Sequence, residues 1–182
     1  MLTSPSLRPD QLRVTTFALL FLATANGVLV AHDLMAAWIA LEASTLAVVP
    51  LIVRTGEPAT RRAAWQYLLF SSAGLGLCLL GFYCLQRGMH VDGEVAPLQL
   101  DTLRATATTG DAKWTRVGLV LTVLGLGTKL GLAPMYAWLP ATYDEAPAAV
   151  GAMLGAVQWN CAFVVLLRVV QVWHGPHGEL LE

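Results

Sequence analysis

The sequence predicts an all-α membrane protein, and three observations support this prediction. Of its 182 residues, 56% are hydrophobic and only 13% are charged, whereas soluble domains average about 25% charged residues. The mean hydropathy is +0.61. Six tryptophans are many for this length, and several lie near the ends of apolar runs, as in the aromatic belts of a bilayer surface. We therefore expect a multi-pass protein in a lipid bilayer.

About five apolar runs are long enough to span a bilayer, which takes about 20 residues per helix. They cover approximately Val14–Ala31, Leu34–Val53, Trp65–Leu85, Val117–Leu139 and Ala148–Val172. We expect them to form one transmembrane domain over residues 14–172, between a polar segment at 1–13 and a polar tail at 173–182. A polar loop at 86–116 separates the third and fourth spans, and it could hold a short hairpin or an interfacial helix.

Several classes of function find no support in the sequence. The net charge is −1, so nothing indicates a nucleic-acid partner. The three cysteines, Cys78, Cys84 and Cys161, show neither C-x-x-C nor metal-ligand spacing, and we interpret them as small buried hydrophobic residues. No Ser-His-Asp, Cys-His or flavin signature is present. We expect no metal, no cofactor and no redox active site in this chain.

Two ionisable residues fall well inside the expected spans, Glu42 in the second and Lys129 in the fourth. A charge near the bilayer centre costs about 2.5–3.5 kcal/mol on insertion scales, and such residues mark ion paths by default. Burial disfavours the charged form of a lysine, and a nearby carboxylate favours it, so the two together could form a proton-transfer device. The alternative is a static ion pair that only fixes helix register.

The fourth span contains residues that interrupt a helix around Lys129. Gly127 and Gly131 flank the lysine, and Pro134 and Pro140 follow it. Proline removes a backbone donor and clashes with the preceding turn. We therefore predict a helix broken near Lys129. Irregular backbone at membrane depth is tolerated only where protein or water covers it, and broken helices are where transporters place ion sites.

Other polar residues lie beside the two charges. Ser44 and Thr45 follow Glu42 in the second span. They could hydrogen-bond the carboxylate or free carbonyl groups, although helix packing is the interpretation we favour for them. Thr128 precedes Lys129 and is a further candidate for polar support.

Several stretches resemble the antiporter-like membrane subunits of respiratory complex I and its relatives, which include Mrp-type cation/proton antiporters and energy-converting hydrogenases. The strongest similarity is to the F-type membrane component of hydrogenase-4. The stretches that carry it are "WIALEASTL" (38–46), "AAWQYLLFSSAGLGLCLLG" (63–81), "TKLGLAPMYAWLPATYDEAPAAVGAML" (128–154) and "NCAFVVLLR" (160–168). The resemblance covers nearly the whole chain except the long loop and both tails.

The resemblance implies a fold, a function and partners. The five spans look like helices four to eight of a bundle of about fourteen, so the chain would be a fragment, a split subunit or a reduced relative. In the family a glutamate and a broken-helix lysine form the proton-pumping pair, and this places those roles on Glu42 and Lys129. It implies a non-redox subunit of a respiratory or hydrogenase complex in the plasma membrane of a prokaryote, with other membrane subunits as partners and protons, or sodium, as cargo.

The chain also departs from the family pattern. Gln66 stands where the family usually has a lysine or a related polar group, and Asn160 stands where complex I subunits often carry a further lysine. Both remain possible supporting polar residues. Three functions stay open: a proton-translocating subunit, an Mrp-type cation/proton antiporter subunit, and a non-conducting membrane scaffold.

Overall fold

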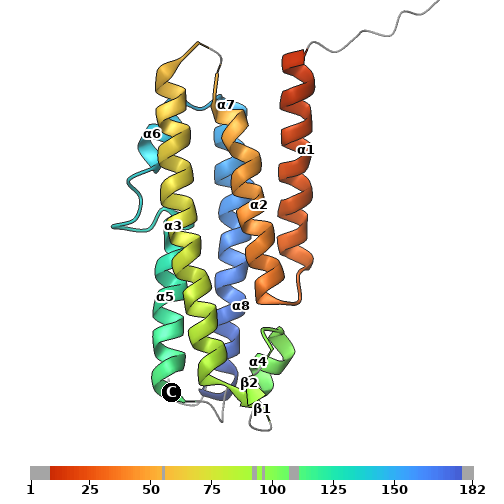
Figure 1. The fold of residues 1–182 in the computed structure, drawn as a ribbon, viewed down its shortest axis with the longest axis vertical. Helices are drawn as coiled ribbons and strands as arrows, with labels where there is room; N and C mark the ends of the chain where they lie inside the picture. The colour runs from red at the N-terminus through yellow and green to blue at the C-terminus, as the bar shows by residue number, and fades with distance from the viewer. Residues whose placement is uncertain (1–8, 55, 92–93, 96, 107–110, 178–182) are drawn as a thin grey trace, which may run out of the picture.

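The chain folds into an elongated bundle of helices whose axes run nearly parallel (Figure 1). The computed structural model describes residues 9–54, 56–91, 94–95, 97–106 and 111–177. Within these residues, four helical stretches are long and apolar enough to cross a membrane: Asp10–Val30, Leu34–Ile52, Pro58–Gly88 and Ala148–Val172. The predicted all-α membrane class is thereby confirmed. The remaining expected span, the fourth, is the one predicted to be broken.

Helices α1 (Pro9–Val30) and α2 (Leu34–Ile52) form an antiparallel pair (Figure 1). Asp33 ends the short connection, and its carboxylate accepts hydrogen bonds from two backbone N–H groups in the first turn of α2, at 2.8 and 3.0 Å. This N-cap explains why α2 begins where the sequence predicted. Helix α1 begins earlier than the expected Val14, because proline is well suited to a first helical turn.

Helix α3 (Pro58–Gly88) is longer than the expected span Trp65–Leu85. Its 31 residues rise about 46 Å at about 1.5 Å per residue, which exceeds a hydrocarbon core of about 30 Å. The added turns carry the charged residues Arg61, Arg62 and Arg87. Hydropathy alone therefore ended the expected span too early at both ends, because charged turns continue the helix past its apolar part.

Helix α5 (Ala112–Leu130) runs antiparallel along α3, and this is the most extensive helix contact in the bundle (Figure 1). Glycines allow the two backbones to approach closely. A Cβ atom on Gly125 would lie 2.5 Å from the backbone of Cys78 and of Gly74. A Cβ atom on Gly81 would lie 2.5 Å from the hydroxyl of Thr122. Small residues at such an interface are typical of membrane helix pairs, and here they fix α5 against α3.

The expected break in the fourth span lies directly after Lys129. Helix α5 ends at Leu130, and Gly131 follows in the left-handed conformation with φ 66°. The backbone N–H of Leu132 donates to the carbonyl of Gly127 at 2.8 Å. This is the Schellman arrangement that ends a helix at a glycine. Glycine at 131 therefore terminates the helix, as the sequence predicted for this position.

The chain then crosses an irregular stretch that contains Pro134 and enters the short helix α6 (Leu139–Glu145), with Pro140 in its first turn. In Figure 1, α5, this stretch and α6 together follow the length of α3. Helix α5 therefore covers the expected fourth span only as far as Leu130, and α6 begins where that span was expected to end.

The polar loop contains a short hairpin, one of the two alternatives expected for it, and also a short helix. A hairpin pairs β1 (His90–Val91) with β2 (Glu94–Val95), and α4 (Leu100–Thr106) follows. Residues 107–110 lie outside the described part. The segment before α4 folds back on the α1–α2 connection, since the N–H of Leu34 donates to the carbonyl of Leu98 at 2.9 Å and the N–H of Leu100 donates to that of His32 at 3.1 Å.

The last span is one continuous helical stretch of three pieces. They are α7 (Ala148–Met153), the π-helical η1 (Leu154–Gln158) and α8 (Trp159–His177). The π turn was not predicted. It widens the helix locally and changes which residues face inward, so that Gln158 is buried while Trp159 and Asn160 are exposed. Helix α8 continues past the expected end at Val172, and residues 178–182 of the expected tail lie outside the described part.

The core consists of two apolar clusters stacked along the bundle. On α2, Leu41 belongs to one cluster and Val48 to the other. Ser44 and Thr45 lie between them and are buried. Polar side chains thus occupy a layer between two apolar layers, and this layer is where Lys129 lies.

Candidate functional site

Lys129 is buried inside the bundle, with only 4% of its surface exposed. It is the second-last residue of α5, and the tight contact between α3 and α5 brings it beside α2 and α3. Its Nζ donates to Thr45 Oγ1 at 2.6 Å and to the hydroxyl of Tyr67 at 3.2 Å. The same nitrogen lies 4.9 Å from the centre of the Tyr67 ring, within range of a cation–π attraction. Two hydroxyl groups and one aromatic face therefore hold the lysine.

These contacts continue into a closed ring of hydrogen bonds. The Tyr67 hydroxyl donates to Gln158 Oε1 at 2.7 Å, and Gln158 Nε2 donates to Ser44 Oγ at 3.2 Å. The hydroxyls of Ser44 and Thr45 both donate to the carbonyl of Leu41, at 2.7 and 2.9 Å. With Lys129, the ring joins α2, α3, α5 and the π-helical turn. Such a buried network fixes the relative positions of its members because unmade hydrogen bonds are costly there.

Glu42 lies one helical turn before Thr45 on α2, but it has a different partner. Its Oε1 accepts a hydrogen bond from Ser72 Oγ of α3 at 2.7 Å. Its Oε2 is buried and has no hydrogen-bond partner among the described residues. The carboxylate and Lys129 are not in ion-pair contact, since the two ion pairs found among the described residues are at other positions. The structure therefore brings the two charges into one neighbourhood without direct contact.

Two tryptophans complete the end of α5 around the lysine. The last carbonyl groups of a helix have no partner within the helix. Trp138 Nε1 donates to the carbonyl of Thr128 at 2.8 Å, and Trp159 Nε1 donates to that of Leu130 at 3.2 Å. Trp138 is buried, and its ring meets the Tyr67 ring edge-on with centroids 5.3 Å apart. Trp138, at the end of the irregular stretch, therefore packs beside Tyr67, the ring partner of the lysine.

The remaining expected residues lie around this site in different ways. Thr128 is buried, and its hydroxyl donates to the carbonyl of Leu124 at 3.3 Å. Gln66 is exposed and borders a surface hollow together with Asp144. Asn160 is exposed as well, and its amide donates to the carbonyl of Ala156 at 2.6 Å. The structure thus places Gln66 and Asn160 outside the ring.

Sequence reasoning missed four members of the site: Tyr67, Ser72, Trp138 and Gln158. Gln158 carried a usable signal, because an amide inside an otherwise apolar span needs partners. Tyr67 and Trp138 gave a weaker signal, because aromatic residues are ordinary at span ends.

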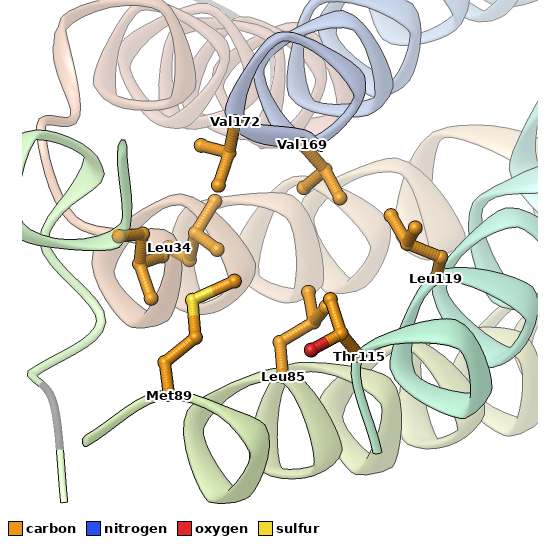
Figure 2. A pocket seen from close by; sticks show the side chains of 8 residues that line it. Leu34, Leu85, Met89, Thr115, Leu119, Val169 and Val172 are labelled. Atoms are coloured by element: carbon orange, nitrogen blue, oxygen red, sulfur yellow. The ribbon is translucent and has the colours of Figure 1, made fainter. Parts of the chain in front are cut away.

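The end of the bundle near α4 is apolar. Figure 2 shows a small cavity there, and its volume is about 10 Å³. Its lining is formed by Leu34, Leu85, Met89, Leu103, Thr115, Leu119, Val169 and Val172. The Thr115 hydroxyl is already used, since it donates to the carbonyl of Asp111 at 2.9 Å. A space of this size without free polar partners does not hold water.

The fold is a bundle of membrane-type helices in which one helix ends directly after a buried lysine. The profile of the family described as NADH:quinone oxidoreductase/Mrp antiporter, TM, matches residues 31–180. The chain belongs to this family.

Curated relatives agree with this assignment. The chain is 31% identical to the hydrogenase-4 component F homolog of Methylacidiphilum infernorum over 84% of its length, and this covers 33% of that protein. It is 33% identical to NADH-quinone oxidoreductase subunit N of Salinispora tropica, over 93% of this chain and 33% of that protein. The chain thus spans about a third of the length of these relatives.

Solved structures show the same fold. A chain of the membrane-bound sulfane sulfur reductase, an archaeal respiratory membrane complex, matches with a TM-score of 0.81 at 20% identity, over 98% of this chain and 36% of that one. Respiratory complex I from Thermus thermophilus matches with 0.75 at 23% identity, over 89% and 35%. The Mrp complex from Dietzia sp. DQ12-45-1b matches with 0.75 at 22% identity, over 90% and 29%.

Proposed function

We propose that this chain carries protons within an antiporter-like membrane subunit of a respiratory-type oxidoreductase or an energy-converting hydrogenase complex. Lys129 is the proton-carrying group and Glu42 is its electrostatic partner. The observation that carries the proposal is the burial of Lys129 among hydroxyl groups at the end of a broken membrane helix.

The partners of Lys129 favour this function over a static ion pair. A buried ion pair depends on both charges, and removing one charge leaves the other uncompensated. Hydroxyl groups place no such condition on the lysine, because a hydroxyl can accept a hydrogen bond from an ammonium group and can also donate one to a neutral amine. The site can therefore hold Lys129 both with and without its extra proton, which a proton carrier requires.

Glu42 would act on Lys129 through space. It lies one turn from Thr45, and its Oε1 is held by Ser72. Coulomb interactions reach further inside a protein than in water, so a change in the charge of Glu42 alters how firmly Lys129 holds its proton. Glu42 Oε2 has no hydrogen-bond partner among the described residues, so it could accept a hydrogen bond from a group that moves toward it.

In this proposal the redox chemistry belongs to partner subunits, and this chain supplies part of the path for protons across the plasma membrane of a prokaryote. The polar hollow near Gln66, Arg62 and Asp144 lies at the end opposite the apolar cavity, and we propose it as the side from which water approaches the site. An Mrp-type cation/proton antiporter subunit is the second candidate, because the fold resembles the Mrp complex as closely as complex I, with a TM-score of 0.75 in each case.

The test is proton flux in vesicles that contain the intact native complex. We expect Lys129→Met and Glu42→Gln each to abolish or strongly reduce flux. Lys113→Met and Glu57→Gln are the matched controls, because both side chains are exposed at the ends of their helices, and we expect both to conduct like wild type. A flux that requires sodium would favour the Mrp-type function. Unchanged flux in Lys129→Met, with assembly intact, would mean that the chain is a scaffold.

A further inference from the structure

In most hydrogen bonds of the ring, the chemistry of the two groups fixes which one donates and which one accepts. The Ser44 and Thr45 hydroxyl hydrogens both point to the carbonyl of Leu41, which can only accept. Ser44 Oγ is therefore an acceptor toward Gln158, and the amide turns its nitrogen to Ser44 and its oxygen to Tyr67. The Tyr67 hydroxyl hydrogen points in turn to Gln158.

This direction suits a charged Lys129 better than a neutral one. Thr45 and Tyr67 both present lone pairs to Nζ, at 2.6 and 3.2 Å, and an ammonium group has only hydrogens to offer. An amine left after proton loss has a lone pair that needs a donor. A buried polar atom without a partner is costly, so the ring has to change when Lys129 loses its proton.

We propose that the Tyr67 hydroxyl is a hydrogen-bond switch that couples the protonation of Lys129 to the last membrane span. With Lys129 charged, the hydroxyl donates to Gln158. With Lys129 neutral, the hydroxyl turns about its C–O bond and donates to Nζ. The switch breaks no covalent bond and moves no heavy atom. This inference rests on the proposed function, in which Lys129 gains and loses a proton. Tyr67 and Gln158 are positioning residues in it.

Thr45 is the other hydroxyl within reach of Nζ, but Tyr67 is the better switch. A phenol is more acidic than an alcohol and is therefore the stronger donor to an amine. The hydrogen of Thr45 also stays within its own helix, where it bonds the carbonyl of Leu41. Of these two hydroxyl groups, Tyr67 is the one that donates to a residue of another span, Gln158.

The consequence falls on the π-helical turn. When Tyr67 turns to Lys129, Gln158 Oε1 loses the hydrogen bond that holds it at 2.7 Å. Gln158 is the last residue of η1, and π turns within α-helices are frequently found at functional sites. The protonation state of Lys129 thus determines whether Gln158, in the last span, accepts a hydrogen bond from Tyr67.

The direct test is infrared spectroscopy of the complex with ring-labelled tyrosine, from which the Tyr67→Phe spectrum is subtracted. The C–O stretch of a phenol depends on whether its hydroxyl donates or accepts. We expect the Tyr67 band to convert between two forms on pH titration of wild type and to keep one form in Lys129→Arg, whose side chain stays charged. Tyr83, exposed on the same helix, is the control through Tyr83→Phe. One unchanging Tyr67 band in wild type, over the whole pH range in which the complex is stable, would overturn the switch.

Flux measurements separate this inference from the proposed function. Tyr67→Phe keeps the aromatic ring but removes the hydroxyl, and Gln158→Leu removes the group that accepts its hydrogen bond. We expect each variant to lower proton flux by about tenfold, which is the effect of one lost hydrogen bond on a rate barrier. Gln171→Leu, at an exposed position of α8, should leave flux unchanged. Lys129-dependent flux with an invariant Tyr67 band would refute the switch alone. A converting band without any flux would refute the proposed function and keep the switch.

Discussion

Trp138 and Thr128 are joined by a hydrogen bond of 2.8 Å from the indole nitrogen to the backbone carbonyl, one residue before Lys129. This contact ties the irregular stretch after the helix break to the end of α5. It satisfies a carbonyl group that the helix itself leaves without a partner. This hydrogen bond therefore fixes the backbone next to Lys129.

Replacing this indole tests how the end of α5 is held. Trp138→Phe keeps an aromatic ring but leaves the Thr128 carbonyl buried and unpaired, which costs about 1–3 kcal/mol. We expect a lower midpoint of thermal unfolding for the purified complex. Trp114→Phe is the control, because Trp114 lies exposed at the start of the same helix. Equal midpoints for the two variants would contradict the role given to Trp138.

The glycine contact between α3 and α5 gives a second prediction. A Cβ atom at Gly125 would meet backbone atoms of α3 at 2.5 Å, and backbone cannot move aside as a flexible side chain can. We expect Gly125→Ala to destabilise the subunit by about 1–3 kcal/mol, as overpacking does, with less subunit recovered in the membrane. Gly76→Ala, on α3 with nothing within 4 Å of its added Cβ, should be recovered like wild type.

Arg168 of α8 fixes the end of α1. Its guanidinium donates to the carbonyls of Val28 at 3.1 Å and Ala31 at 2.8 Å, and also to that of Leu29. A lysine cannot match this fork of donors. We expect Arg168→Lys to speed hydrogen exchange in the last turn of α1, because hydrogen bonds of a charged group are worth about 1.5–3 kcal/mol. The exposed Arg116 provides the comparison through Arg116→Lys, and identical exchange in both variants would refute the role of Arg168.

Two neighbouring serines on α3 allow a matched test of Glu42. Ser72 donates to the carboxylate, whereas the buried Ser71 hydroxyl has no partner among the described residues. Ser72→Ala leaves the carboxylate without this donor, so we expect reduced proton flux. Ser71→Ala removes an unsatisfied group, which is neutral or stabilising, and flux should stay at the wild-type level. A loss of flux in Ser71→Ala alone would contradict this assignment.

Much of the fold was predictable because membrane spans follow from apolar length. The apolar runs located α1, α2, α3 and the last span, and Gly131 with its prolines predicted the break that the structure contains. Span ends were less predictable, since α3 carries Arg61 and Arg62 inside its first turns. A helix can continue through charged turns, and a hydropathy pattern does not mark those turns as part of a span.

The site was only half predictable, for a geometric reason. Glu42 and Lys129 stood out because an ionisable group in an apolar span is costly wherever it faces. An uncharged polar residue belongs to the site only if its side chain points into the bundle. A step of one residue along a helix turns the side chain by about 100°. Gln66 is exposed while its neighbour Tyr67 is buried, and Asn160 is exposed while Gln158 is buried. The π turn that sets the facing of Gln158 left no signal in the sequence.

The most direct test of the account is proton flux through the intact complex with Lys129→Arg. Arginine keeps the positive charge and the hydrogen-bond donors, but it does not release its proton. If Lys129 carries protons, flux is lost while the subunit still assembles. If flux persists at the wild-type level, a fixed positive charge is sufficient at this position, and the central claim that Lys129 takes up and releases a proton is wrong.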